Sequence, residues 1–205
     1  DGSITLVDAK HVEQHLDEVK PEGAENEAVE QVAFADRIVL NKTDLVSEDD
    51  LTRVEGRLRG INAFAPILRS QKSQVSVDQV LGIRGFDLDR TLKMDPEFLN
   101  TEGEHEHDTS VSSVSITVPG EVHMLLVNEW IGEILTEKGN DVYRMKGILA
   151  ISGSTKKFVY QGVHMIFDGN FDEDWGKDEA RGNKLVFIGK NLDKEQLEKS
   201  FRSCL

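Results

Sequence analysis

The sequence predicts an α/β protein in which a parallel-sheet unit is followed by a smaller α+β unit with a mainly antiparallel sheet. Short apolar strands alternate with helical segments over residues 1–85, and this rhythm is typical of βαβ units. Residues 86–111 are polar and acidic without a sustained period, which indicates a flexible linker. Residues 112–205 have the order strand, helix, strands and helix, which favours helices on one face of an antiparallel sheet.

The first unit opens with a short apolar run rich in β-branched residues, which favours a strand. We expect its strands at residues 4–8, 36–40 and 66–68. Helical spacing of apolar residues predicts helices at residues 9–19, 25–35, 48–59 and 75–83. In the first helix we expect Val12, Leu16 and Val19 to share one face. Ser47 and the three acids after it have the pattern of an N-cap and first turn, and we expect Gly60 to end that helix.

The second unit begins near Ser112 with an alternating strand. Its later strands are expected at residues 142–151, 158–167 and 185–189, with a turn at Gly153. Between the first two strands lies a strongly helical segment that Gly139 should end. Its predicted apolar stripe consists of Val122, Leu126, Trp130 and Ile134. Asp193 is the expected N-cap of a final helix.

Charge and cysteine content limit the possible partners and location. The formal net charge of the 205 residues is −14, so we expect neither a nucleic-acid partner nor docking on anionic membrane. No run of 18 or more apolar residues predicts a membrane-spanning helix. The single cysteine, Cys204, fits a reducing compartment, and we expect a cytoplasmic location. The start, DGSITLVDAK, is neither a Met start nor a signal peptide, so we expect a piece of a longer protein.

The chemically informative segment is Asn-Lys-Thr-Asp at residues 41–44, directly after the second expected strand. Parallel sheets bind ligands at the carboxyl ends of their strands. Guanine presents its N1–H and N2 amine donors side by side, and the carboxylate of Asp44 can accept both. Adenine lacks the N2 amine and has a bare acceptor at N1, so such a site can reject it by roughly 10⁴-fold or more. We expect Asn41 to bond the other polar edge of the base and nearby loops, and Lys42 to lay its stem along the purine face. The alternative is a polar loop that merely opens a helix.

A second loop follows the third strand. Ser70, Gln71 and Lys72 resemble the weaker second guanine loop of GTPases, and Ser70 is therefore a candidate nucleotide-binding residue; an ordinary βα loop is the alternative. The phosphate-binding motif G-x-x-x-x-G-K-[ST] does not occur in the sequence. We therefore assign no catalytic residue, expect the phosphate and Mg²⁺ sites to lie upstream, and expect no GTP hydrolysis by this chain alone.

Longer segments carry a family resemblance. SITLVDAKH at residues 3–11 and NKTDLV at residues 41–46 resemble the CobW-type GTPases. DVYRMKGILAISG, FVYQGVHMIFD and LVFIGKNLDKEQLEKSF resemble the CobW C-terminal domain. Within that family, the resemblance points to the eukaryotic zinc-regulated GTPase metalloprotein activators. It implies that residues 1–85 are the C-terminal portion of a P-loop GTPase domain, residues 86–111 a flexible acidic linker and residues 112–205 a CobW C-terminal domain.

The resemblance also implies a function. It implies GTP hydrolysis coupled to delivery of a metal, Zn²⁺, to a client metalloenzyme such as methionine aminopeptidase, with GTP, Mg²⁺ and Zn²⁺ as the bound groups. The Walker A and Cys-x-Cys-Cys motifs of the family have no counterpart here and would precede Asp1. Two alternatives stay open: a non-catalytic module that binds a client, and a GTPase chaperone for another metal such as cobalt.

Four histidines are candidate metal ligands. His11 and His15 are four residues apart on an expected helix, so both project from one face. His105 and His107 lie in the acidic linker, where imidazoles and carboxylates together suit Zn²⁺. For both pairs the alternative is ordinary solvent exposure.

Overall fold

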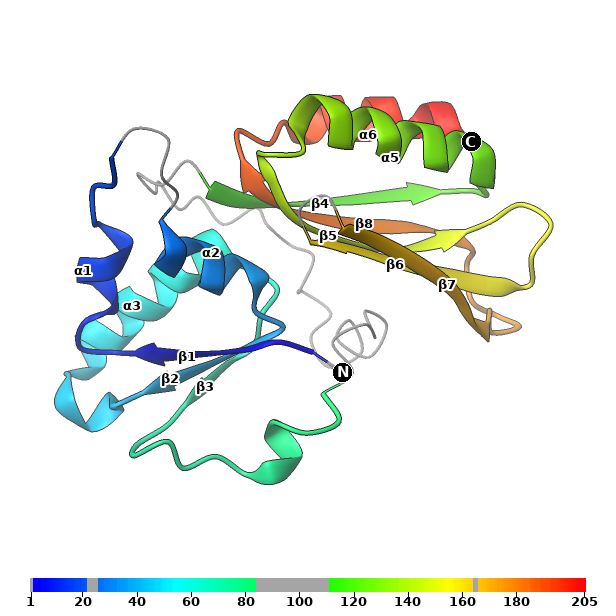
Figure 1. Ribbon diagram of the computed structural model, residues 1–205. Coiled ribbons are helices and arrows are strands. Elements are labelled where there is room, and N and C mark those ends of the chain that lie inside the picture. Colours follow the sequence, from blue (N-terminus) through cyan, green and yellow to red (C-terminus); the bar gives the residue numbers. More distant parts are fainter. Residues whose placement is uncertain (1, 22–25, 84–110, 164–165) are drawn as a thin grey trace. The chain divides into compact units, whose positions relative to one another are not determined.

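A computed structural model of the chain describes residues 2–21, 26–83, 111–163 and 166–205 (Figure 1). The chain divides into two compact units, which meet in sequence close to Val111 and are described separately below. Most of the expected acidic linker, including His105 and His107, lies outside the described residues.

The first unit is built on a parallel sheet of three strands in the order β1-β2-β3. The strands are β1 (Ile4–Asp8), β2 (Arg37–Asn41) and β3 (Ile67–Arg69). The helical elements are α1 (Val12–Leu16), α2 (Glu27–Phe34), η1 (Thr43–Leu45), α3 (Glu48–Ile61) and η2 (Val77–Gln79). Both β-pairings are parallel, so the predicted βαβ architecture is confirmed.

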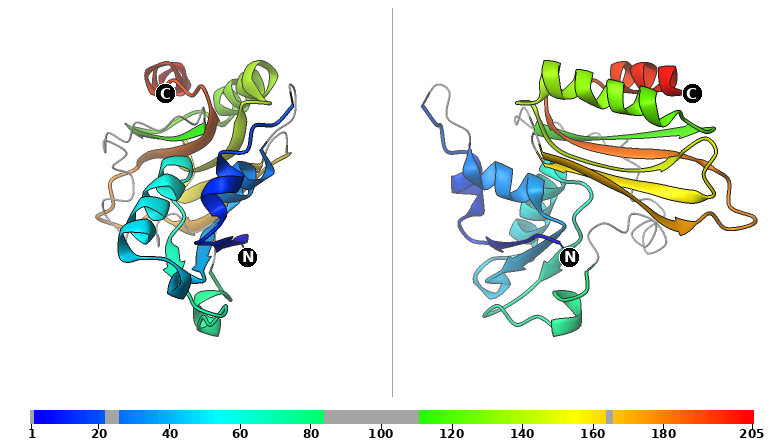
Figure 2. Two further views of the ribbon diagram at one scale, coloured as in Figure 1. Left: turned by 90° about the vertical axis from the view of Figure 1, so that its left-hand side faces the viewer. Right: turned by 45° about the vertical axis from the view of Figure 1, so that its right-hand side comes forward.

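One face of this sheet packs against helices, as Figures 1 and 2 show for α2 and α3. Ile38 and Leu40 of β2 are fully buried there. Leu58 of α3 is also fully buried, and Val54 is 1% exposed. This core anchors β2, and with it the loop that follows Asn41.

Three predicted helix limits in this unit are wrong. Helix α1 ends at Leu16, and Val19 is 94% exposed. The side chain of Asn26 donates to the carbonyls of His15 and Leu16, at 2.9 and 3.2 Å, and so satisfies the end of the helix. Helix α3 passes Gly60 and is capped at Asn62. The expected helix at residues 75–83 is reduced to the short 3₁₀ helix η2.

The Asn62 side chain explains why α3 extends past the glycine. Its amide donates to the carbonyls of Val32, Ala33 and Ala35, at 2.9, 3.2 and 3.0 Å. The same side chain accepts from the backbone N–H of Ala65 at 3.1 Å. Asn62 is 1% exposed, and it ties the ends of α2 and α3 together through buried hydrogen bonds.

The second unit is a five-stranded sheet in the order β4-β8-β5-β6-β7. Its strands are β4 (Val111–Pro119), β5 (Val142–Ala150), β6 (Lys156–Val163), β7 (Ile166–Asp174) and β8 (Gly182–Lys190). β5 pairs antiparallel with β6 and β8, and β6 pairs antiparallel with β7. Its helical elements are α5 (Met124–Lys138), α6 (Lys194–Phe201) and η3 (Arg202–Cys204). Figure 2 shows α5 and α6 on one face of the sheet, as predicted.

The core of this unit is centred on Trp130 of α5. Its ring meets Phe201 and Phe187 edge to face, with centroids 5.0 and 6.1 Å apart. Its Nε1 donates to Ser200 Oγ at 2.9 Å. The predicted ends at Gly139 and Asp193 are confirmed, since Gly139 is the C-cap of α5 and the Asp193 side chain caps α6.

Two predictions for the second unit are wrong. The strand expected at residues 158–167 is instead the hairpin of β6 and β7, in which Val163 pairs with Ile166. Residues 163–166 contain none of Gly, Pro, Asn or Asp, so the sequence carried no turn signal. The predicted stripe of α5 is wrong only in part: Trp130 and Ile134 are buried as expected, whereas Val122 precedes the helix and Leu126 is 38% exposed. The face that α5 buries consists of Val127, Trp130, Ile131 and Ile134.

Among the described residues, no helix is both long enough and apolar enough to cross a membrane.

Candidate functional site

The loops that follow the three parallel strands meet at one edge of the first sheet. Asp8, the last residue of β1, lies opposite Asn41, the last residue of β2. Leu40 lies opposite Arg69 at the end of β3, and the N–H of Ser70 donates to the Leu40 carbonyl at 2.8 Å. The sheet therefore brings together the segments around residues 8, 41–44 and 70–73, at the edge where parallel sheets bind ligands.

Asn41 holds the loop that follows β3. The residue is 8% exposed. Its Nδ2 donates to Ser73 Oγ at 3.0 Å, and its Oδ1 accepts from the Ser73 backbone N–H at 2.9 Å. Ser73 and its neighbour Lys72 have left-handed backbone conformations, with φ of 57° and 51°. Of the two roles expected for Asn41, the bond to a nearby loop is present, and contact with a base stays a prediction.

Thr43 connects the same two loops through one carbonyl. Its backbone N–H and its Oγ1 both donate to the carbonyl of Ser70, at 3.3 and 3.1 Å. Ser70 is 4% exposed, and its own Oγ donates to the Gln74 carbonyl at 3.1 Å. The Ser70 side chain is thus engaged within its loop, and its predicted contact with a nucleotide stays a prediction.

Lys42 has an uncommon backbone conformation, with φ of 62°. This left-handed residue turns the chain from β2 into η1. Its Nζ contacts Asp8 Oδ2 at 2.6 Å, a short charge-assisted hydrogen bond between residues from two different strand ends. The Lys42 side chain is 47% exposed, so about half of its surface is open to solvent.

Asp44 has the opposite environment. The residue is exposed, and within the described part of the chain no group donates a hydrogen bond to its carboxylate. A carboxylate with all its acceptor positions available can receive two parallel N–H donors from a ligand. That is the property needed to recognise the N1–H and N2 amine of guanine.

Asp8, like Ser73, lies at this edge and was not among the residues predicted from the sequence. Its Oδ2 accepts from Lys42 Nζ at 2.6 Å and lies 3.0 Å from His11 Nδ1, and its Oδ1 accepts from the Lys10 N–H at 2.9 Å. Partial burial by itself raises the pKa of Asp8, but the hydrogen bonds from Lys42, His11 and Lys10 outweigh it and hold the pKa well below its ordinary value. Asp8 is therefore a charged residue held in place by hydrogen bonds. The sequence feature that could have pointed to it is a carboxylate at the end of a strand expected to pair in parallel with β2.

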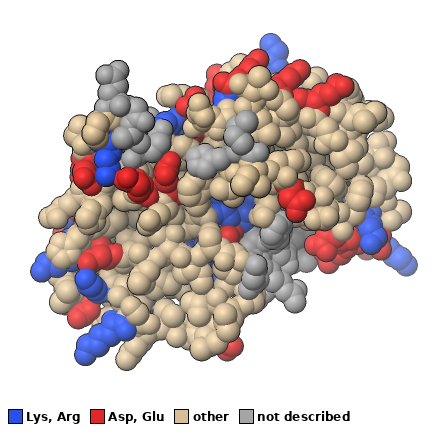
Figure 3. Space-filling model, in the orientation of Figure 1, with Lys and Arg blue, Asp and Glu red and all other residues tan. Residues whose placement is uncertain are grey.

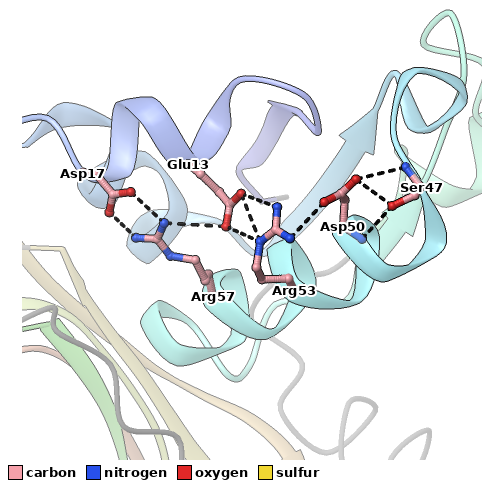
Figure 4. Close-up of polar contacts among 6 residues, drawn as sticks. All are labelled: Glu13, Asp17, Ser47, Asp50, Arg53 and Arg57. Carbon is pink, nitrogen blue, oxygen red and sulfur yellow. Dashed lines mark hydrogen bonds and ion pairs between the residues drawn. The ribbon is translucent and has the colours of Figure 1, made fainter.

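Ion pairs join α1 and its C-cap residue Asp17 to α3 (Figure 4). Arg53 of α3 donates to both carboxylate oxygens of Glu13, with Nη2–Oε2 at 2.9 Å, and also reaches Asp50 at 2.9 Å. Arg57 binds Asp17 through both terminal nitrogens. Hydrogen bonds from Arg53 hold the pKa of Glu13 below its ordinary value, against the opposing effect of partial burial.

Ser47 connects this network to the start of α3. Its Oγ lies 2.6 Å from Asp50 Oδ2 and accepts from the Asp50 N–H at 3.2 Å, which completes a capping box. The predicted N-cap at Ser47 is thereby confirmed.

On the face drawn in Figure 3, basic side chains are interspersed among acidic ones.

In the described part of the first unit, His11 and His15 have different surroundings. His11 precedes α1, and its Nδ1 contacts Asp8, whereas His15 lies within α1 and lines a cavity of about 340 Å³ beside β1 and α2. No group of three or more His, Cys, Asp or Glu residues in the described ranges has an arrangement that could hold a metal ion. A zinc site needs three or four protein ligands, so these two imidazoles alone do not complete one. Their role as metal ligands stays a prediction.

Two domain families match the chain. Residues 1–69 match the CobW/HypB/UreG nucleotide-binding domain, and residues 111–205 match the cobalamin synthesis protein cobW C-terminal domain. The chain is similar to the zinc chaperone YjiA of Escherichia coli, with 29% identity over 98% of the chain and 60% of the relative. It is also similar to the zinc-regulated GTPase metalloprotein activator 1 of Saccharomyces cerevisiae, with 26% identity over 100% of the chain and 55% of the relative.

A solved structure has the same fold. The crystal structure of Zn(II)-bound YjiA GTPase from E. coli matches with a TM-score of 0.77 and 28% identity, over 100% of this chain and 61% of that chain. The zinc chaperone CobW of Pseudomonas aeruginosa is 32% identical over 86% of the chain and 46% of the relative. The chain thus spans between 46% and 60% of the length of these curated relatives.

Proposed function

The chain belongs to the CobW family, and we propose that it is the guanine-reading part of a GTP-hydrolysing zinc metallochaperone that delivers metal to a client metalloenzyme. The observation that carries this proposal is the exposed carboxylate of Asp44 at the carboxyl end of β2, which accepts no hydrogen bond from the described residues. It lies in an Asn-Lys-x-Asp loop that hydrogen bonds from Asn41 and Thr43 hold in place. The names of the relatives, zinc chaperones and zinc-regulated GTPase activators, support the metal and the nucleotide.

The proposed recognition divides the work among the loop residues. Asp44 accepts the N1–H and N2 amine of guanine, which no other common nucleobase offers side by side. Lys42 covers one face of the purine with its aliphatic stem. Asn41 and Thr43 hold the loops after β2 and β3 at a fixed spacing through their hydrogen bonds to Ser73 and Ser70. A preformed loop loses little conformational entropy when the base binds.

We place phosphate binding, Mg²⁺ and hydrolysis in residues that precede this chain in the intact protein. Two observations support this placement. The sequence has no G-x-x-x-x-G-K-[ST] motif, and the chain spans only 60% of the YjiA relative. In this proposal the described residues supply the loop that reads the base, and another segment of the intact protein supplies the cradle for the phosphates.

Zinc, in this proposal, is the cargo. His11 and His15 supply at most two imidazoles, so the remaining ligands would come from outside the described residues. The client is a metalloenzyme, for which the family resemblance suggests methionine aminopeptidase. The buried free thiol of Cys204 fits a reducing compartment, and we place the protein in the cytoplasm.

The proposal is tested through the base selectivity of the intact protein. Asp44→Asn replaces one acceptor oxygen with a donor, so it should bring the affinities for GTP and ATP together, with a loss of selectivity on the order of 10²-fold or more. Competition binding with a fluorescent guanine nucleotide measures both affinities. The matched control is Asp49→Asn, at another exposed acid five residues further along the chain, which should leave selectivity unchanged. Unaltered GTP-over-ATP selectivity in Asp44→Asn would refute the assignment.

A further inference from the structure

We propose that Asp8 is a positioning residue of the base site, whose carboxylate fixes the ammonium group of Lys42 so that the lysine stem is held in place for the purine face. The inference rests on the proposed function of the Asn41–Asp44 loop. It adds to that loop a residue from a different strand, 34 positions earlier in the sequence.

The contact between the two side chains follows from the sheet register. Asp8 ends β1 opposite Asn41, and Lys42 is the next residue of β2's loop. The Lys42 Nζ to Asp8 Oδ2 distance of 2.6 Å is that of a charge-assisted hydrogen bond. The Asp8 side chain is 28% exposed and therefore partly screened from water, which strengthens the pair relative to one in full solvent.

Asp8 is itself held by further hydrogen bonds. Its other oxygen accepts from the Lys10 N–H at 2.9 Å, and the imidazole of His11 contacts Oδ2 at 3.0 Å. Both donors lie in the turn that leads into α1, so the carboxylate is oriented from its own side of the site. An anchor oriented in this way can fix its partner rather than follow it.

Lys42 is fixed at both ends. Its backbone has φ of 62°, and the next residue, Thr43, donates through its N–H to the Ser70 carbonyl at 3.3 Å. Its ammonium group is held by Asp8. The methylene groups between these two fixed points form the surface offered to the purine, and an unanchored lysine would have to give up its rotamer freedom when the nucleotide binds.

This role predicts a specific pattern of nucleotide affinities. The Lys42 stem contacts the face of the base, which guanine and adenine share, whereas Asp44 reads the edge, in which they differ. Loss of the Asp8 anchor should therefore weaken binding of GTP and ATP by the same factor. The GTP-to-ATP ratio should stay that of the unaltered protein.

The first test measures nucleotide affinity of the intact protein carrying Asp8→Asn. A partly exposed ion pair supports an effect of about 3- to 5-fold on the dissociation constant of a fluorescent GDP. The matched control is Glu198→Gln in α6, whose pair with Arg202 has the same 2.6 Å distance and similar exposure. It should not change the affinity. An Asp8→Asn protein that melts at the normal temperature and binds GDP with unchanged affinity would overturn the proposal.

The second test is a double-mutant cycle. Lys42→Met keeps the length of the stem and removes the ammonium group, so Asp8→Asn should have no further effect in that background. A full additional effect of Asp8→Asn there would overturn the proposal, because Asp8 would then act independently of Lys42. The assignment of Asp44 to the base is tested separately by Asp44→Asn. If that assignment is wrong, Asp44→Asn leaves GTP-over-ATP selectivity unchanged. If only the Asp8 proposal is wrong, Asp44→Asn still lowers this selectivity, and the double-mutant cycle shows no coupling between Asp8 and Lys42.

Discussion

Two carboxylates at the strand ends, Asp8 and Asp44, differ in how many hydrogen bonds they accept. Asp8 is engaged by Lys42, His11 and the Lys10 N–H, so its oxygens are committed within the protein. Asp44 accepts no hydrogen bond from the described residues, so its acceptor positions are available to a ligand. A carboxylate whose oxygens are hydrogen-bonded within the protein can orient its neighbours, and one with free acceptor positions can bind the donors of a base.

The amide of Asn41 provides a test at the level of a single residue. Asn41→Ala leaves the backbone N–H of Ser73 without its buried acceptor, so we expect the free energy of unfolding of the chain to fall by about 1 to 2 kcal/mol. Ser73→Ala is the control: it removes only the Oγ acceptor and should cost less than about 1 kcal/mol. Urea denaturation followed by circular dichroism measures both. An Asn41→Ala chain as stable as the wild type would show that the bond does not brace the loop.

A functional segment whose residues are adjacent in the sequence could be predicted from the sequence, whereas contacts between residues far apart in the sequence could not. Asn41 to Asp44 form one short segment whose residue types and position after a strand indicate a base-reading loop. The partners that hold this segment, Asp8 and Ser73, lie 34 and 32 positions away from the residues they contact. Only the strand register brings them within hydrogen-bond distance.

At the scale of the element, α1 depends on its neighbours. The helix has only five residues, too few to be stable in isolation. Arg53 of α3 binds Glu13 of α1, and Arg57 binds Asp17, the C-cap of α1. The Asn26 side chain satisfies carbonyls at the end of α1. Helix α1 follows the turn that holds Asp8, so these contacts also stabilise the edge of the candidate site.

The ion pair of Glu13 makes a prediction about pH. Hydrogen bonds from Arg53 lower the pKa of Glu13 below 4.5, so its contribution to stability is present above that pH and is lost as the carboxylate becomes protonated at lower pH. Glu13→Gln should reduce the free energy of unfolding at pH 7 by about 0.5 to 1 kcal/mol, and the difference should disappear in strongly acidic solution. Denaturant titrations of both chains across this pH range measure it.

The control for this prediction is Glu129→Gln, an exposed residue of α5 in the other unit. At pH 7 its free energy of unfolding should stay within about 0.5 kcal/mol of the wild type. A Glu13→Gln penalty that stays constant down to the lowest pH would mean that charge pairing with Arg53 is not the source of the stabilisation.

Three of the errors in the predicted elements have a common physical origin. The alternation of strands and helices followed from local periodicity and is confirmed, apart from the β6–β7 hairpin, which was expected as one strand. The end of α1 depends on Asn26, the extension of α3 past Gly60 depends on the contacts of Asn62, and the buried face of α5 is set by the packing of Trp130 on Phe201. Each of these is a tertiary contact that local periodicity does not contain.

At the scale of the whole molecule, the proposed base-reading loop lies in a chain whose sequence has no G-x-x-x-x-G-K-[ST] motif. We expect no GTP turnover above background by the chain as given, and turnover together with bound zinc in the intact protein that contains it. Phosphate release and elemental analysis, each with and without GTP, measure both properties. ATP is the control substrate and should be hydrolysed much more slowly. GTP turnover by the chain alone would contradict the proposed division of the site.

The central claim is that Asp44 reads the edge of guanine, and exchange of the base tests it most directly. Xanthine has a carbonyl acceptor at C2 where guanine has the N2 amine, so it needs a donor where Asp44 offers only acceptors. In competition binding by the intact protein, we predict that wild type prefers GDP over xanthosine diphosphate and that Asp44→Asn reverses the preference, with an overall change on the order of 10²-fold or more. An Asp44→Asn protein that folds normally and still prefers GDP would contradict the account.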